Sequence, residues 1–337
     1  MDDREIVAFG VALLYLRRRL PRRWIWLHGK FHRLVQELRL DGEQFQHFFC
    51  LDREQFDSLL SKIGPVITMT TTNYRRPISP AEHLVICLQF LATGDSYRTI
   101  ACSYSVGMST VASIVTQVTR VIWDALVLEF MPVPTTEDWR SIAEGFRCQW
   151  AFPNCLGSID GKHVVTRAPD NSGSLFYNYK GTYSIVLLAV VDSHYGRDSD
   201  GGVLANSDFG QKLLDGTLDL PLDALLPGAD HMGRQPYVFV ADEAFPLHRN
   251  LMRSFPGHQS GSHRLFNFRL SHARLIVENT FGILTSQWHM YRGVIGCVCV
   301  CVCVCVRASM GCIHDNQYTE NTNTCVRTRL LGHIHMV

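Results

Sequence analysis

The sequence predicts an α/β protein with an all-helical first part, to about residue 150, and a second part that contains both strands and helices. Apolar residues recur at helical spacing in the first part, as in residues 31–63 and 80–130. After residue 151, short runs rich in Val, Ile and Leu are typical of buried strands. These runs cover residues 155–166, 183–191 and 237–241. Because helical segments follow the strands, at 203–214 and 271–290, the order indicates an α/β domain over residues 151–294.

The composition indicates a folded chain with balanced charge. The 337 residues include 32 Lys and Arg against 31 Asp and Glu, with 46% hydrophobic and 19% charged residues. These values exclude a disordered or low-complexity chain and argue against a generally basic nucleic-acid coat, although a local basic face stays open. No apolar run reaches the roughly 18–20 residues of a membrane span. Acids precede the first apolar stretch (6–16) and three arginines follow it, the reverse of a secretory signal. We therefore expect a soluble, intracellular protein.

Residues 80–130 are predicted to form a helix-turn-helix-like unit. Pro80 opens a helix that Gly94 ends, and Ser96 caps a short second helix over 97–103. Val106 and Gly107 supply a turn, after which Ser109 can cap a long third helix. The apolar face of the third helix consists of Val111, Ile114, Val115, Val118, Ile122 and Ala125. Its outward residues include few of the Arg, Lys or Asn side chains that usually read DNA. The unit is therefore either a DNA-contacting module or a helical scaffold.

A tract of alternating Val and Cys lies near the end of the chain. Five cysteines alternate with valine between residues 297 and 305. Strict alternation provides no turn between ligands, as zinc sites require, whereas a translated GT dinucleotide repeat encodes this pattern. The segment after it, 307–337, has neither a helical nor a strand period. We predict that residues 295–337 are a non-native tail.

Three acids in the second part stand where an unpaired carboxylate is costly. Asp160 interrupts a strand, Asp242 ends another, and Glu278 lies within an apolar helix. One such acid is usually a satisfied core residue or a cap. Three at one core are better explained by a shared cation, because carboxylate oxygens bind Mg²⁺ and two-metal sites cleave phosphodiesters.

The motifs around these acids resemble the DDE nuclease domain of the Harbinger/PIF transposase superfamily, over residues 155–290. The matching segments are GSIDGKH (157–163), YKGTYS (179–184), SDGG (199–202), NS (206–207), ADEAFPL (241–247), NFRLSHAR (267–274) and VENTFG (277–282). The resemblance implies an RNase H-like fold and a nuclease dependent on Mg²⁺ or Mn²⁺. The family's acids correspond to Asp160, Asp200, Asp242 and Glu278, with Asp160, Asp242 and Glu278 as the catalytic core.

The resemblance also implies roles for residues around the acids. Lys180 is expected to contact a DNA phosphate or to end a loop. Arg274 is expected to pair with Glu278, to face solvent or to contact DNA. His163 is expected to be a satisfied core histidine or a residue behind the metal ligands. A strand of the family is missing near residue 195, so the preceding strand should be an unpaired edge and Asp200 a weaker ligand.

Two kinds of function follow from these residues. The first is a nuclease acting on DNA phosphodiesters in the nucleus, or else in the cytoplasm, with DNA and a separate DNA-binding protein as partners and no membrane. The alternative is an inactive relic or truncated gene product that keeps only a helical DNA- or protein-binding module.

Overall fold

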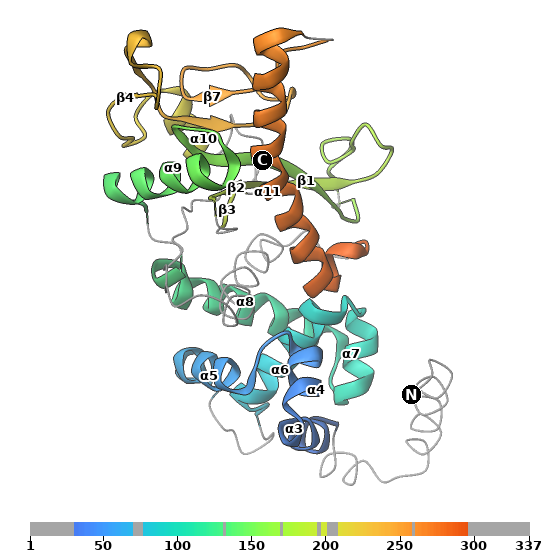
Figure 1. The fold of residues 1–337 in the computed structure, drawn as a ribbon. Helices are drawn as coiled ribbons and strands as arrows, with labels where there is room; N and C mark the ends of the chain where they lie inside the picture. Colours follow the sequence, from blue (N-terminus) through green and yellow to red (C-terminus); the bar gives the residue numbers. More distant parts are fainter. Residues whose placement is uncertain are drawn as a thin grey trace, which may run out of the picture. The chain divides into compact units, whose positions relative to one another are not determined.

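The computed structural model describes residues 30–69, 77–130, 133–168, 171–193, 197–200, 208–257 and 260–295 (Figure 1). The chain divides into two compact units, Met1–Val118 and Thr119–Val337, and one helix, α8, crosses from the first into the second. The described residues of the first unit form helices joined by short segments, and those of the second contain a sheet. A helical region followed by a mixed α/β region is therefore confirmed, while the predicted boundary at residue 150 stays a prediction.

Six helices lie within the described residues up to Phe130. They are α3 (Lys30–Leu40), α4 (Gly42–Phe49), α5 (Arg53–Ile67), α6 (Pro80–Thr93), α7 (Tyr97–Tyr104) and α8 (Met108–Phe130). Asp41 caps α4, and Asp52 caps α5 in a capping box with Gln55. Three fully buried rings, Phe45, Phe49 and Phe56, contact one another with centroid separations of 4.8–5.9 Å. The caps define where the two helices begin, and the rings hold α4 and α5 against each other.

The helix ends predicted between residues 80 and 130 are largely confirmed. Pro80 begins α6, and Gly94 ends it with a left-handed backbone (φ 68°) that glycine adopts without strain. The side chain of Ser96 accepts the backbone N–H of Thr99 and so caps α7. The prediction for Ser109 is wrong, because α8 begins one residue earlier, at Met108.

One helix among the described residues, over Met108–Val127 of α8, is long and apolar enough to cross a membrane. Length and composition are weak evidence for a membrane span, since the core helices of soluble proteins share them. The predicted apolar face of this helix is buried inside the protein from Val111 to Ile122. The face does not include Ala125, which is exposed, and continues instead at Leu126, which is buried.

His83 on α6 is expected to make the stability of the first unit depend on pH. The side chain is buried, Nδ1 has no hydrogen-bond partner among the described residues, and burial lowers the pKa of the imidazole. A histidine with a lowered pKa binds fewer protons in the folded than in the unfolded state, so stability is lost as pH falls below about 6.5. We expect His83→Gln to flatten this loss in denaturant titrations between pH 8 and pH 5. An equal loss in both proteins would contradict the assignment.

The second unit is built on a five-stranded mixed sheet of order β3-β2-β1-β6-β7. Its strands are β1 (Cys155–Val165), β2 (Ser184–Val191), β3 (Arg197–Asp200), β6 (Val238–Val240) and β7 (Leu251–Met252). β2 is antiparallel to both β1 and β3, whereas β6 is parallel to β1 and to β7. A separate hairpin consists of β4 (Ala224–Leu225) and β5 (Arg234–Gln235). The strands predicted around residues 155–166, 183–191 and 237–241 are thus confirmed, and the first two are neighbours in the sheet.

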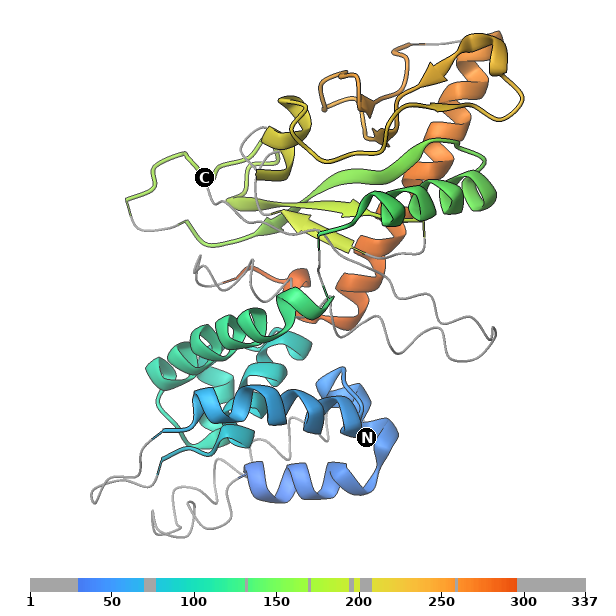
Figure 2. The ribbon, with the colours of Figure 1, turned by 90° about the vertical axis from the view of Figure 1, so that its left-hand side faces the viewer.

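Helices cover both faces of this sheet (Figure 2). On one face, α9 (Thr136–Trp150) and α10 (Asp208–Leu214) enclose a core in which Trp139 and Leu213 pack with Ile159 and Phe239. On the other face lies α11 (Gly261–Gln287), whose Ile276 and Val277 are fully buried and whose Phe281 ring lies 5.8 Å from Lys162 Nζ. Because side chains alternate along a strand, Ile159 faces α9 while Asp160 and Lys162 face α11.

The prediction that β2 is an unpaired edge strand is wrong, because β3 pairs with it. The backbone of β3 pairs with β2 from Val191↔Arg197 to Leu188↔Asp200. The sequence Arg-Asp-Ser-Asp has no β-branched residue to signal a strand, and pairing with β2 supplies the backbone partners instead. Asp200 therefore lies on a strand and not on an unsupported loop.

The last described residue, Ile295, belongs to the fold. It is buried and bridges to Thr166, and its backbone accepts the N–H of Arg167 at 3.0 Å. The Val-Cys tract and the predicted non-native tail beyond it lie outside the described residues, as do residues 203–207 at the start of the predicted helix 203–214.

Candidate functional site

Asp160 stands at the middle of β1, the central strand of the sheet. β1 pairs with β2 on one side and with β6 on the other; Asp160 lies opposite Ala189 of β2, two residues beyond the last pair with β6. Its side chain is 22% exposed, and its Oδ1 accepts the N–H of Gly161 at 2.9 Å. A Cβ at Gly161 would lie 3.1 Å from a methyl group of Val186, which explains a glycine here. The strand thus presents one partly buried carboxylate toward α11.

The parallel pairing of β1 and β6 brings Asp242 beside Asp160. Ser158 of β1 is paired with Val240 of β6. Asp160 lies two residues after Ser158, and Asp242 lies two residues after Val240. Neighbouring strands are about 4.8 Å apart, so the two acids extend from adjacent positions. Asp242 Oδ1 accepts the N–H of Ala244 at 3.0 Å, which forms a turn immediately after the strand. This register places two acids that have 81 residues between them in the sequence at one edge of the site.

Glu278 reaches the same region from α11. The helix is anchored to the sheet by its buried residues, among them Ala273, Ile276 and Phe281. The side chain of Glu278 is 52% exposed, and its carboxylate acts electrostatically on Asp160 of β1, against which the helix packs. The structure therefore gathers Asp160, Asp242 and Glu278 from three separate elements of the second unit.

Asp160 responds electrostatically to both of the other acids. Burial is the largest cause that raises the pKa of its carboxyl, and the carboxylates of Asp242 and Glu278 raise this pKa further. The Gly161 N–H and the guanidinium of Arg274 act in the opposite direction and lower it. Mutual repulsion among carboxylates is the electrostatic pattern that a bound cation relieves.

Arg274 is the positive charge nearest to the acids among the described ion pairs. Its Nη2 lies 3.8 Å from Glu278 Oε1, one helical turn away, and 4.0 Å from Asp160 Oδ1. The pairing with Glu278 agrees with one of the alternatives predicted from the sequence. The contact with Asp160 could not be predicted, because helical spacing identifies only neighbours on the same helix.

The donor set fits a hard divalent cation in its chemistry, since all three side chains offer carboxylate oxygens. Among the described residues, however, no three His, Cys, Asp or Glu side chains are grouped closely enough to hold one metal ion. The positive charge beside Asp160 and Glu278 belongs instead to Arg274. Asp160, Asp242 and Glu278 would hold the ion, and the metal site itself stays a prediction.

Asp200 is farther from this group along the sheet. Its backbone is opposite Leu188 on β2, and β2 separates β3 from β1. The backbone of Asp200 on β3 is therefore two strand spacings, or about 10 Å, from β1. The side chain of Asp200 lies outside the described part of the chain, so its role as a fourth ligand stays a prediction.

The loop between β1 and β2 carries Lys180 beside the ring of Tyr179. Asn178 holds the loop in place, because its Oδ1 accepts the N–H groups of Lys180 and Thr182 and its Nδ2 donates to Ser184 Oγ at 2.7 Å. Lys180 Nζ lies 5.4 Å from the ring centroid of Tyr179, which is 83% exposed. His163 is hydrogen-bonded to Ser184 at 2.8 Å, in agreement with a satisfied histidine.

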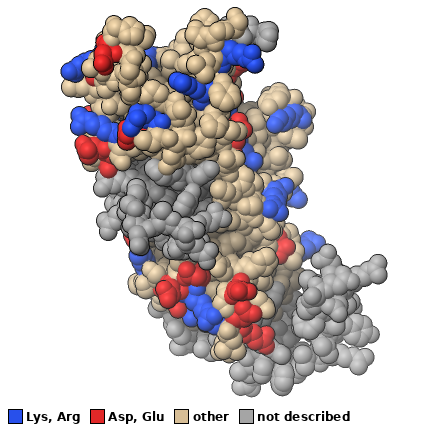
Figure 3. Space-filling model, in the orientation of Figure 1, with Lys and Arg blue, Asp and Glu red and all other residues tan. Residues whose placement is uncertain are grey.

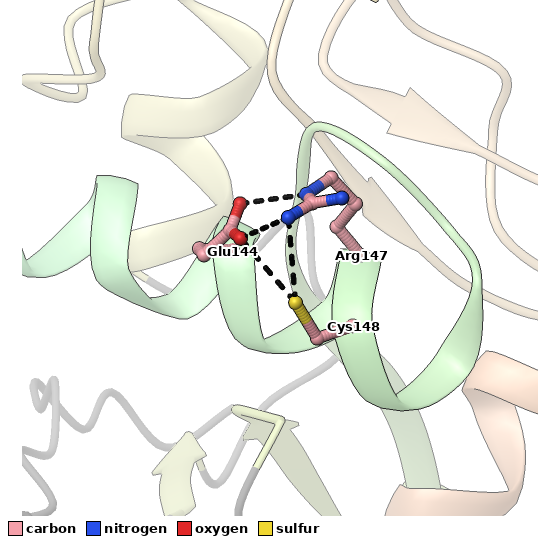
Figure 4. Close-up of polar contacts among 3 residues, drawn as sticks. All are labelled: Glu144, Arg147 and Cys148. Atoms are coloured by element: carbon pink, nitrogen blue, oxygen red, sulfur yellow. Dashed lines mark hydrogen bonds and ion pairs between the residues drawn. The ribbon is translucent and has the colours of Figure 1, made fainter. Parts of the chain in front are cut away.

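A second group of titratable side chains lies on α9 and was not predicted (Figure 4). Glu144 accepts hydrogen bonds from both Arg147 and the thiol of Cys148, and these bonds lower the pKa of Glu144 to about 2. The bond to Glu144 is also the largest cause that raises the pKa of Cys148. The thiol is therefore protonated at neutral pH and is a poor nucleophile. This exposed group resembles an ordinary helix-surface ion pair and not an active site.

Charged side chains do not form one extended basic surface on the face drawn in Figure 3. Lys and Arg residues of the described part are scattered there singly or in small groups, with Asp and Glu among them. This distribution agrees with the balanced composition, and it directs attention to local contacts such as Lys180 and Arg274.

Comparisons with known proteins bear on the origin of this arrangement. Residues 159–308 match the family described as DDE superfamily endonuclease, and this range contains Asp160, Asp242 and Glu278. The chain is 25% identical to "Protein ALP1-like" of Arabidopsis thaliana over 287 residues, which cover 80% of this chain and 69% of that protein. It is 22% identical to "Putative nuclease HARBI1" of Rattus norvegicus over 286 residues, which cover 81% of this chain and 77% of that protein.

No solved structure matches the chain. The family match and the two relatives agree with the motifs around the three acids, and together they confirm the resemblance seen in the sequence. Residues 159–308 are thus similar to the DDE superfamily endonucleases, and the chain resembles the Harbinger transposase-derived nucleases.

Proposed function

We propose that this protein is a divalent-metal-dependent nuclease that cleaves DNA phosphodiesters, with Asp160, Asp242 and Glu278 as its catalytic carboxylates. The observation that carries the proposal is the placement of these acids on three neighbouring elements, where the carboxylates of Asp242 and Glu278 raise the pKa of Asp160. Asp160 and Asp242 extend from adjacent parallel strands, and Glu278 comes from the helix packed across them. The family match supports the reaction class.

The order of the sheet supports an RNase H-like fold. Three antiparallel strands, β1 to β3, are followed by β6, which returns parallel to the central strand, and then by β7. This topology brings the end of β6 beside the middle of β1. Asp160 and Asp242 are thereby brought together by the pairing of Ser158 with Val240, although 81 residues lie between the two acids in the sequence.

Each residue at the site has a definite task in the proposed reaction. Asp160, Asp242 and Glu278 would hold Mg²⁺ or Mn²⁺, which would activate water or a 3′-hydroxyl and stabilise the departing oxygen. Asp200 is proposed as an additional, weaker ligand. We propose that two positive side chains bind DNA phosphates. They are Lys180, on the loop that Asn178 holds in place, and Arg274, beside the acids.

The helices α6, α7 and α8 are proposed as a helix-turn-helix-like unit. Short turns at 94–96 and 105–107 join the three helices, and Ser113 and Arg120 are exposed on the third. Few exposed side chains on α8 can read bases, so we propose that a separate DNA-binding protein supplies much of the target selection. A DNA substrate also leads us to propose the nucleus as the location.

Cleavage of supercoiled plasmid tests the proposal. We expect nicking in Mn²⁺ or Mg²⁺ and none in excess chelator. We expect the nicking rate of Asp160→Ala to fall by at least about 100-fold, because loss of a metal-binding carboxylate should reduce activity no less than loss of a residue that hydrogen-bonds to a metal ligand. Asp219→Ala is the matched control, since Asp219 is an exposed aspartate of the same unit outside the site.

The outcomes separate this function from the alternative of an inactive relic. Equal nicking by wild type and Asp160→Ala would assign the activity to a contaminant. No nicking by a wild-type protein that melts cooperatively would indicate an inactive chain that keeps only its fold.

A further inference from the structure

Arg274 has an unusual position for an arginine on a surface helix. Its side chain is only 18% exposed and approaches two acids from different elements, Glu278 on α11 and Asp160 on β1. Its Nε is buried and has no hydrogen-bond partner among the described residues. We infer that Arg274 is a resident counter-ion, which neutralises Asp160 and Glu278 in the metal-free protein and gives way when a divalent cation binds.

The distances favour an exchangeable counter-ion over a fixed structural bridge. An arginine committed to a carboxylate usually donates two hydrogen bonds of about 2.7–2.9 Å. Arg274 instead lies 3.8 Å from Glu278 and 4.0 Å from Asp160, beyond hydrogen-bond distance from both. Asp160 Oδ1 already accepts a closer bond from Gly161. The guanidinium therefore compensates charge at both acids without being locked to either.

The same oxygens cannot serve the guanidinium and a divalent cation at once. The charge of Arg274 lies within about 4 Å of the atoms that would bind the metal, so the two positive charges would repel each other strongly in this partly buried region. This repulsion is removed if the side chain of Arg274 moves away from the acids while its backbone stays in the packed helix. This inference rests on the proposed function for the identity of the cation.

Metal affinity measured by calorimetry tests the exchange directly. With Mn²⁺ titrated into chelator-treated protein, we expect Arg274→Gln to bind about tenfold more tightly than wild type, because no resident charge must be displaced. Arg274→Lys, which keeps the charge, should remain near wild type. Arg269→Gln is the matched control, an exposed arginine on the same helix, and should leave the affinity unchanged. Unchanged or weaker Mn²⁺ binding in Arg274→Gln would overturn the inference.

Melting in excess chelator tests the counter-ion role without any metal. We expect Arg274→Gln to lower the melting temperature of the wild-type chain but not that of the Asp160→Asn/Glu278→Gln double variant, in which the acids no longer need a counter-ion. An equal loss in both backgrounds would mean that Arg274 acts by packing alone, and the inference would fail. If wild type and variants bind no Mn²⁺ while this cycle holds, it is the metal-dependent function that fails.

Discussion

Phe239→Ala is expected to destabilise the second unit by about 3–5 kcal/mol, much of the 5–15 kcal/mol that stabilises a typical domain. Phe239 is fully buried on β6, and its ring makes edge contacts with Trp139 of α9 at 5.7 Å and Phe209 of α10 at 5.3 Å. Truncation would leave a cavity between the sheet and both helices. It would also loosen the strand that carries Asp242.

Denaturant unfolding followed by tryptophan fluorescence measures this loss, since Trp139 contacts the deleted ring. Phe268→Ala is the control, because Phe268 lies on α11 with 68% of its surface exposed and should change stability by less than about 0.5 kcal/mol. A loss below about 1 kcal/mol in Phe239→Ala would show that this core is not the main support of β6.

Asp242→Asn is expected to abolish the rise in melting temperature that Mn²⁺ produces, whereas Asp200→Asn should leave most of it. Asp242 is beside Asp160 across one strand pair, while the backbone of Asp200 is two strands away. Free Mn²⁺ at about 100 times its dissociation constant adds about 2.7 kcal/mol to the folded state. For a unit of this size, that free energy corresponds to a rise of several degrees in the melting temperature.

Thermal melting with Mn²⁺ and with excess chelator provides the comparison for each variant. The melting temperatures in chelator serve as the control, because a variant that is already unfolded cannot report on metal. An equal loss of the metal-induced rise in Asp200→Asn and Asp242→Asn would make Asp200 a full ligand, against the strand order described above.

Local chemistry explains which parts of the fold could be predicted from the sequence. Pro80, Gly94 and Ser96 mark helix ends through backbone geometry and capping, and the structure has helix ends at each of them. The valine-rich run of β2 identifies a buried strand by composition alone. The first ten residues of α11, from Gly261 to Leu270, are mostly exposed and lack an apolar period, so the prediction began the helix at Ser271.

Contacts between distant segments explain what could not be predicted. β3 has no strand-forming sequence and exists through its pairing with β2. The approach of Arg274 to Asp160 depends on how α11 crosses the sheet, which no local pattern reveals. Asp160, Asp242 and Glu278 could be named beforehand because each stands out in its own segment, and helical spacing gave the pair of Arg274 with Glu278, whereas the contact of Arg274 with Asp160 could not be predicted.

Nicking of supercoiled plasmid by Glu278→Gln, compared with wild type, tests the central claim most directly. Glu278 is half exposed, so its replacement should leave the melting temperature in chelator nearly unchanged. With folding preserved, we expect Mn²⁺-dependent nicking by wild type and nicking reduced by at least about 100-fold in the variant. Nicking by Glu278→Gln at the wild-type rate would contradict the assignment of a three-carboxylate nuclease site.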